Sequence, residues 1–104
     1  MDLVESIYKL TQRFPDFEKY GLTSQMRRSA VSISSNIAEG SARKGDKELI
    51  QFLYIAIGSL SELETKYLIA VRLAFVEKEN VLENQMIELK KLLIGFKNYI
   101  DNKM

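Results

Sequence analysis

Any chemistry in this chain rests on carboxylates and basic side chains, because its 104 residues include neither histidine nor cysteine. Zinc or copper sites built from imidazole or thiolate are excluded, as are catalytic triads that use histidine. The carboxylates in an unusual context are Glu39, Glu62 and Glu64. Di-metal sites in helical bundles need Glu-x-x-His motifs, so these glutamates predict no metal centre. We expect structural ion pairs instead, and a protein with no catalytic residue and no cofactor.

The stretch 32–43, Ser-Ile-Ser-Ser-Asn-Ile-Ala-Glu-Gly-Ser-Ala-Arg, is rich in mediocre helix formers. It stays helical only if tertiary packing holds it. Within it, Asn36 and Glu39 are three positions apart and need hydrogen-bond partners if they are buried. We interpret them, with Glu62 and Glu64, as a structural polar network at a helix–helix or subunit contact. A polar binding site inside a bundle is the alternative.

Basic side chains cluster at two places, although the net charge of the chain is only +1. The candidates for binding nucleic acid are Arg43, Lys44 and Lys47, with Arg27 and Arg28 as a second group. Asp46 and Glu48 dilute the first group, so an ordinary solvated turn is the alternative there. The second group is available only if Glu62 and Glu64 do not pair with it, and the expected helix register predicts that they do.

Aromatic side chains that stack on bases are not obviously interleaved with either basic cluster. Tyr8, Tyr20 and Tyr99 are the nearest candidates in the sequence. We interpret them as packing or rim residues rather than as part of a binding site.

Hydrophobic periodicity predicts an all-α chain, and 46% hydrophobic content suffices for one core in a single domain, 1–104. The expected helices span residues 2–13, 23–43, 46–75 and 79–102. Pro15 ends the first helix, because the residue before a proline is pushed out of the helical region. Thr23 or Ser24 is the expected N-cap of the second helix, and Asp46 that of the third.

Short connections make these helices antiparallel neighbours in an up-down-up-down four-helix bundle. The turn between the second and third helices sets a register that places Ala30 against Gly58 and Ser59. The first helix is too short to cover the third, so the segment 37–43 lacks an apolar partner within one chain. We therefore expect a homo-oligomer. The longest uncharged run, 49–61, is too short to span a bilayer, so we expect a cytoplasmic protein without a membrane segment.

Several segments together resemble the signature of a known bacterial family. They are Phe14-Pro15, 20–25, Arg27-Arg28, 32–43, Phe52-Leu53, 56–60 and 62–65. The pattern covers essentially the whole chain and resembles the four helix bundle proteins, also called 23S rRNA-intervening sequence proteins. The resemblance implies a homopentamer with a central channel, and a first helix longer than the one expected here. Accessory proteins of diversity-generating retroelements look similar, which implies binding of nucleic acid and of a reverse transcriptase.

Two classes of function follow. The first is an oligomeric, non-enzymatic protein that binds RNA or DNA, RNA above all, through basic turns repeated around a ring. Such repetition strengthens binding even when each contact is weak. The alternative is a protein-interaction scaffold, or an accessory subunit for a partner enzyme such as a reverse transcriptase.

Overall fold

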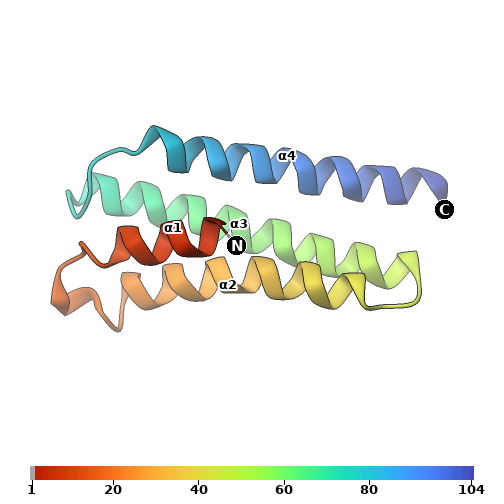
Figure 1. Ribbon diagram of the computed structural model, residues 1–104, viewed down its shortest axis with the longest axis horizontal. Coiled ribbons are helices and arrows are strands. Elements are labelled where there is room, and N and C mark those ends of the chain that lie inside the picture. Colours follow the sequence, from red (N-terminus) through yellow and green to blue (C-terminus); the bar gives the residue numbers. More distant parts are fainter. Residues whose placement is uncertain (1) are drawn as a thin grey trace.

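The computed structural model describes residues 2–104 and is all-α (Figure 1). Its elements are α1 (Asp2–Thr11), the short 3-10 helix η1 (Asp16–Glu18), α2 (Leu22–Ser41), α3 (Asp46–Arg72) and α4 (Asn80–Lys103). The helices lie side by side along the long axis and reverse direction at each connection (Figure 1). The fold is therefore the predicted antiparallel four-helix bundle.

The observed N-cap residues of α2 and α3 differ from the predicted ones. Gly21 and Gly45 are the N-cap residues of α2 and α3, and neither start has a side-chain capping hydrogen bond. Thr23, Ser24 and Asp46, which the sequence predicts as caps, lie inside the first turns instead. Glycine serves at an N-cap without a side-chain bond where water reaches the first N–H groups of the helix.

The helix ends fall up to three residues from the predicted bounds, and α3 shows why. It ends at Arg72 rather than at 75, because Ala74 adopts a left-handed conformation with φ of 61°. The N–H of Phe75 then donates to the carbonyl of Ala70 at 3.0 Å, and the N–H of Ala74 to that of Val71, also at 3.0 Å. This is the Schellman pattern, which usually has glycine at the left-handed position. Because alanine rather than glycine stands at this position, the sequence does not indicate where the helix ends.

Replacing Ala74 with glycine is expected to raise the free energy of unfolding by about 1 kcal/mol, because glycine avoids the steric cost of the left-handed conformation. Thermal unfolding at fixed protein concentration measures the change. Ala42→Gly is the matched control, since Ala42 ends α2 with an ordinary φ of −84°. There the substitution is expected to lower stability. Equal effects of the two substitutions would contradict this account of the end of α3.

The core consists of the predicted apolar stripes. The fully or almost fully buried side chains include Leu3, Ile7, Leu10, Phe14, Met26, Ala30, Ile33, Leu53, Ala56, Leu60, Leu63, Tyr67, Ala70, Leu82, Met86 and Leu93. In α3 the apolar residues spaced three and four apart are buried from Leu53 to Ala70. Ala74 continues this spacing but is exposed, because the helix has already ended.

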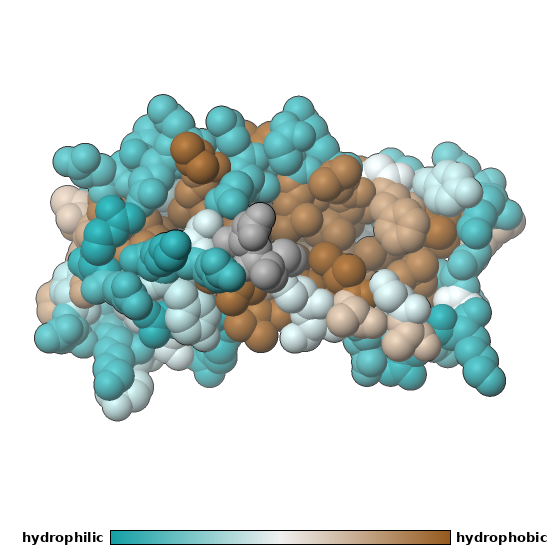
Figure 2. Space-filling view, viewed as in Figure 1, coloured by the Kyte–Doolittle hydropathy of each residue, from teal (hydrophilic) through white to brown (hydrophobic). Residues whose placement is uncertain are grey.

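One half of the bundle lacks a cover from α1. In Figure 1 this helix begins only opposite the middle of α2 and overlies one half of the molecule. Phe96 of α4 is 45% exposed and Ile37 of α2 is only half-buried, although both continue the apolar spacing of their helices. Figure 2 shows an apolar area on this face beyond the start of α1, between α2 and α4. The predicted length mismatch is therefore present in the fold.

The close approach of α2 to α3 lies at Gly40, not at Gly58. A Cβ atom added at Gly40 would lie 2.8 Å from the Cβ of Phe52, which is shorter than real contacts allow. A Cβ added at Gly58 would meet nothing within 4 Å. The predicted contact of Ala30 with Gly58 is therefore wrong, because Gly58 points away from α2. Ser59, the other residue predicted there, does face α2, and its Oγ lies 2.9 Å from Ser32 Oγ. Figure 1 shows α2 and α3 side by side along this whole length.

Tyr67 of α3 forms hydrogen bonds with residues at the start of α4. Its hydroxyl donates to Glu83 Oε2 at 2.7 Å and accepts from the backbone N–H of Glu79 at 2.8 Å. Burial raises the pKa of the Tyr67 hydroxyl. The hydrogen bond from Lys78, followed by that from Tyr67, lowers the pKa of the Glu83 carboxyl. The buried hydroxyl is thus satisfied on both sides, which fixes the α3–α4 connection.

Candidate nucleic-acid interface

A groove of about 580 Å³ lies beside the first half of α2, where α1 and the α1–α2 connection meet it. Its lining residues are Tyr8, Lys19, Tyr20, Thr23, Ser24, Arg27, Arg28, Val31 and Ser32. Three of these side chains are cationic and two are aromatic, and among the side chains of residues 3–104 no carboxylate lines the groove. The groove therefore has the charge and the lining of a site for an anionic ligand with a flat ring.

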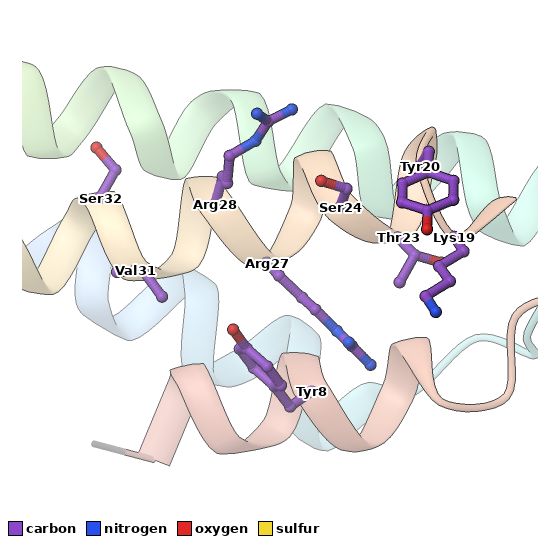
Figure 3. A pocket seen from close by; sticks show the side chains of 9 residues that line it. All are labelled: Tyr8, Lys19, Tyr20, Thr23, Ser24, Arg27, Arg28, Val31 and Ser32. Atoms are coloured by element: carbon purple, nitrogen blue, oxygen red, sulfur yellow. The ribbon is translucent and has the colours of Figure 1, made fainter.

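Arg27 is held in place before any ligand arrives. Its Nε–H donates to Thr11 Oγ1 at 2.8 Å, and the Thr11 hydroxyl in turn donates to the carbonyl of Ile7 at 2.7 Å. The guanidinium carbon lies 4.5 Å from the centre of the Tyr8 ring. Figure 3 shows Arg27 reaching from α2 toward α1 beside Tyr8. Among the side chains of residues 3–104 its terminal nitrogens have no hydrogen-bond partner. They remain available for two parallel bonds to a phosphate.

The ion pairs predicted for Arg27 and Arg28 do not form. Glu62 lies 3.4 Å from Lys66, one turn along the same helix, and Glu64 pairs with Lys90 of α4. The prediction failed because each glutamate has a lysine closer than any arginine of α2. Neither arginine takes part in an ion pair among the described residues. Their charges are therefore free for a ligand.

Arg28 belongs to two pockets at once. It lines the groove and also a pocket of about 300 Å³ between α2 and α3, together with Ser59, Glu62 and Lys66. In Figure 3 its side chain lies on the opposite side of α2 from Tyr8 and α1. An extended anion that follows the groove therefore passes Arg28 where it leaves the groove.

The predicted polar network is present only in part. Asn36 Nδ2 donates to the carbonyl of Ser32 at 2.8 Å and to Ser32 Oγ at 3.1 Å, and Ser32 Oγ lies 2.9 Å from Ser59 Oγ. These contacts link α2 to α3. Glu39 lies outside them, because its side chain is 53% exposed and pairs with Arg43 at 3.3 Å. Joining Glu39, Glu62 and Glu64 to Asn36 in one network was therefore wrong.

The turn between α2 and α3 offers less unpaired positive charge than the number of its basic residues predicts. Arg43 pairs with Glu39 and lies 3.9 Å from Glu48, and its guanidinium carbon lies 5.0 Å from the centre of the Phe52 ring. Lys44 and Lys47 are exposed and form no ion pair within the described residues. About 15 Å of α2 separate this turn from Ser32, the last residue of the helix that lines the groove. One chain therefore presents two separate basic surfaces, the groove and the turn between α2 and α3.

The sequence interpretation missed Lys19 and gave too little weight to Tyr8 and Tyr20. Lys19 Nζ lies 5.7 Å from the centre of the Tyr20 ring, and the Tyr20 side chain is 87% exposed. In the sequence these residues stand apart from the arginines. The reversal between α1 and α2 brings them to one groove, and only the predicted antiparallel hairpin hinted at this.

Other kinds of site are not found in the described part of the chain. No group of three or more acidic side chains in residues 2–104 is placed to hold a metal ion. No helix in the same range combines the length and the apolar character needed to cross a membrane. What stands out is the cationic, tyrosine-lined groove.

The fold and the groove define an all-α bundle protein with a cationic surface site. Residues 1–95 match the family model described as 23S rRNA-intervening sequence protein, and the chain belongs to this family. Among curated proteins, none matches this chain.

Proposed function

We propose that this protein is a non-enzymatic, oligomeric RNA-binding protein whose contact surface is the groove between α1 and α2. The observation that carries the proposal is that the groove is lined by three cations and, among the side chains of residues 3–104, by no carboxylate. The held guanidinium of Arg27 supplies a preorganised phosphate contact, and Arg28 and Lys19 extend the positive surface on either side. Lys44 and Lys47 form a second, weaker place at the far end of α2.

We propose further that the chain assembles as a homo-oligomer through the face that α1 leaves uncovered. The support is the partial exposure of Phe96 and Ile37, together with the apolar area that Figure 2 shows beyond the start of α1. The pentamer in particular rests on the family resemblance alone. Each added copy repeats the groove, so several weak phosphate contacts act on one RNA.

Light scattering at micromolar concentration is expected to give a mass well above the 12.0 kDa of one chain, about 60 kDa for a pentamer. Phe96→Glu is expected to lower this mass, because it places a charge on the uncovered apolar face. Val81→Glu is the control, since Val81 is 77% exposed at the opposite end of α4. A wild-type protein that stays at 12.0 kDa would end the proposed assembly.

Retention of a generic single-stranded RNA is expected to fall steeply as salt rises. Each phosphate that a cation neutralises releases counterions and adds about 0.7 to the slope of log affinity against log salt for single strands. Three cations per groove, repeated in an oligomer, predict a slope clearly steeper than that of a single contact. Fluorescence anisotropy between low and physiological salt measures it. A wild-type protein that binds no RNA even at low ionic strength would overturn the proposed function.

A protein-interaction scaffold, for example for a reverse transcriptase, is the second candidate. The exposed apolar area in Figure 2 favours it, because such areas mark contact sites for other proteins. The two candidates differ in their response to salt. Apolar docking of a protein partner survives high salt, whereas phosphate binding does not.

A further inference from the structure

We infer that the groove binds an unpaired nucleotide, with Tyr20 as the surface on which its base stacks. This inference rests on the proposed RNA binding and specifies the part of the RNA that is recognised. A purely electrostatic surface needs only cations, and it binds duplex and single strands alike. The groove offers an aromatic ring beside its cations, and an aromatic ring contributes only where a base is free to stack.

Tyr20 has the exposure that stacking requires. Its side chain is 87% exposed, so the ring contributes little to the core of the bundle. It belongs to the segment between η1 and α2, and in Figure 3 it lies at the end of the groove near Lys19 and Thr23. Stacking on a base would cover the open face of this ring.

The second aromatic ring has a different task. Tyr8 is 40% exposed, and its ring already faces the guanidinium of Arg27. That stacking orients the guanidinium and leaves its terminal nitrogens directed to a phosphate. The groove thus divides into a phosphate part at Arg27 and a base part at Tyr20. Its volume of about 580 Å³ accommodates both parts of one nucleotide.

The base itself must be free. In an A-form duplex the bases are stacked inside the helix, and aromatic side chains cannot reach their faces. The groove therefore selects single-stranded segments, such as loops and ends, over duplex RNA. Selectivity for a particular base does not follow, because every base presents an aromatic face.

The chain contains no tryptophan, so Tyr20→Trp introduces a single fluorescent reporter at the proposed stacking surface. Titration with a single-stranded 20-mer of uridine is expected to quench this fluorescence, because the base covers the indole ring. A duplex of the same length is expected to quench it far less. Inorganic polyphosphate has the charge but no base, and it is expected to bind without quenching.

Tyr99 provides a matched control at the other end of the bundle. It is 62% exposed, and Lys103 Nζ lies 5.7 Å from its ring centre, the same distance as in the pair of Lys19 and Tyr20. Tyr99→Trp is expected to show no quenching. Tyr20→Ala is expected to weaken single-strand binding by about five- to a hundredfold, Tyr20→Phe to retain it and Tyr99→Ala to leave it unchanged.

The possible results separate this inference from the proposed function. Equal affinity for single strand and duplex, with no loss in Tyr20→Ala, would overturn the stacking role while leaving electrostatic RNA binding in place. Failure to bind RNA and polyphosphate alike would overturn both. Quenching at Tyr20→Trp by the single strand, together with the loss in Tyr20→Ala, would support both.

Discussion

Charge reversal at Arg28 is expected to abolish retention of single-stranded RNA at physiological salt. Arg28 lines both the groove and the neighbouring pocket, is exposed, and forms no ion pair among the described residues. Arg28→Glu removes the attraction between this side chain and an RNA phosphate and replaces it with a repulsion. Each of these terms is worth about 1–4 kcal/mol near a surface. Since about 1.4 kcal/mol corresponds to tenfold, the expected loss of affinity is at least tenfold per groove and larger in an oligomer.

The control for Arg28→Glu is Lys91→Glu, which changes the net charge by the same amount. The Lys91 side chain is 71% exposed on α4, with only a 4.0 Å contact to Glu88. Anisotropy titrations of both variants, and their masses by light scattering, measure the effect. If both variants lose RNA equally, binding follows net charge rather than the groove. If Arg28→Glu retains wild-type affinity with its mass unchanged, the groove is not the contact surface.

The periodic features of the fold were predictable because they are local. The stripe of Leu3, Ile7, Leu10 and Phe14 is buried as its spacing predicts, since residues three and four apart share one face of a helix. The end of the first helix was likewise readable from Pro15, because the residue before a proline is pushed out of the helical region.

Features that depend on how two helices are rotated against each other were not predictable. Glu64 pairs with Lys90 of α4 rather than with an arginine of α2, because α3 lies between both helices and the sequence does not choose the partner. Gly58 faces open space although the expected register placed it in the contact. A one-residue rotation of 100° is enough to move a side chain off a contact face.

The candidate site combined both kinds of feature. Arg27 and Arg28 were recognisable as basic residues, but their availability depended on the ion pairs that Glu62 and Glu64 form elsewhere. The contact of Arg27 with Tyr8 joins residues 19 positions apart in two helices, so it exists only once α1 and α2 are packed. No local pattern encodes such a contact. For this reason the sequence alone indicated packing or rim roles for Tyr8 and Tyr20.

Adding a single methyl group at Gly40 is expected to destabilise the fold, whereas the same change at Gly58 stabilises it. A Cβ at Gly40 would lie 2.8 Å from Phe52 Cβ and 3.1 Å from Leu49 Cδ1. The first of these atoms is bonded directly to the backbone and cannot swing aside, so α2 and α3 must separate. Overpacking of this kind costs about 1–3 kcal/mol, and the helix preference of alanine over glycine offsets about 0.5–1 kcal/mol of it. For a chain of this size each 1 kcal/mol of net loss lowers the melting temperature by about 4–8 °C.

Gly58→Ala is the matched control, because the new Cβ meets nothing within 4 Å and the residue lies inside α3. Alanine loses less conformational entropy than glycine on folding into a helix, so the variant is expected to gain about 0.5–1 kcal/mol. Thermal unfolding of both variants at one protein concentration tests the opposite signs. A Gly40→Ala protein that melts at or above the wild-type temperature would show that α2 and α3 are farther apart at this point. In that case the small side chains of the stretch 32–43 have a reason other than helix packing.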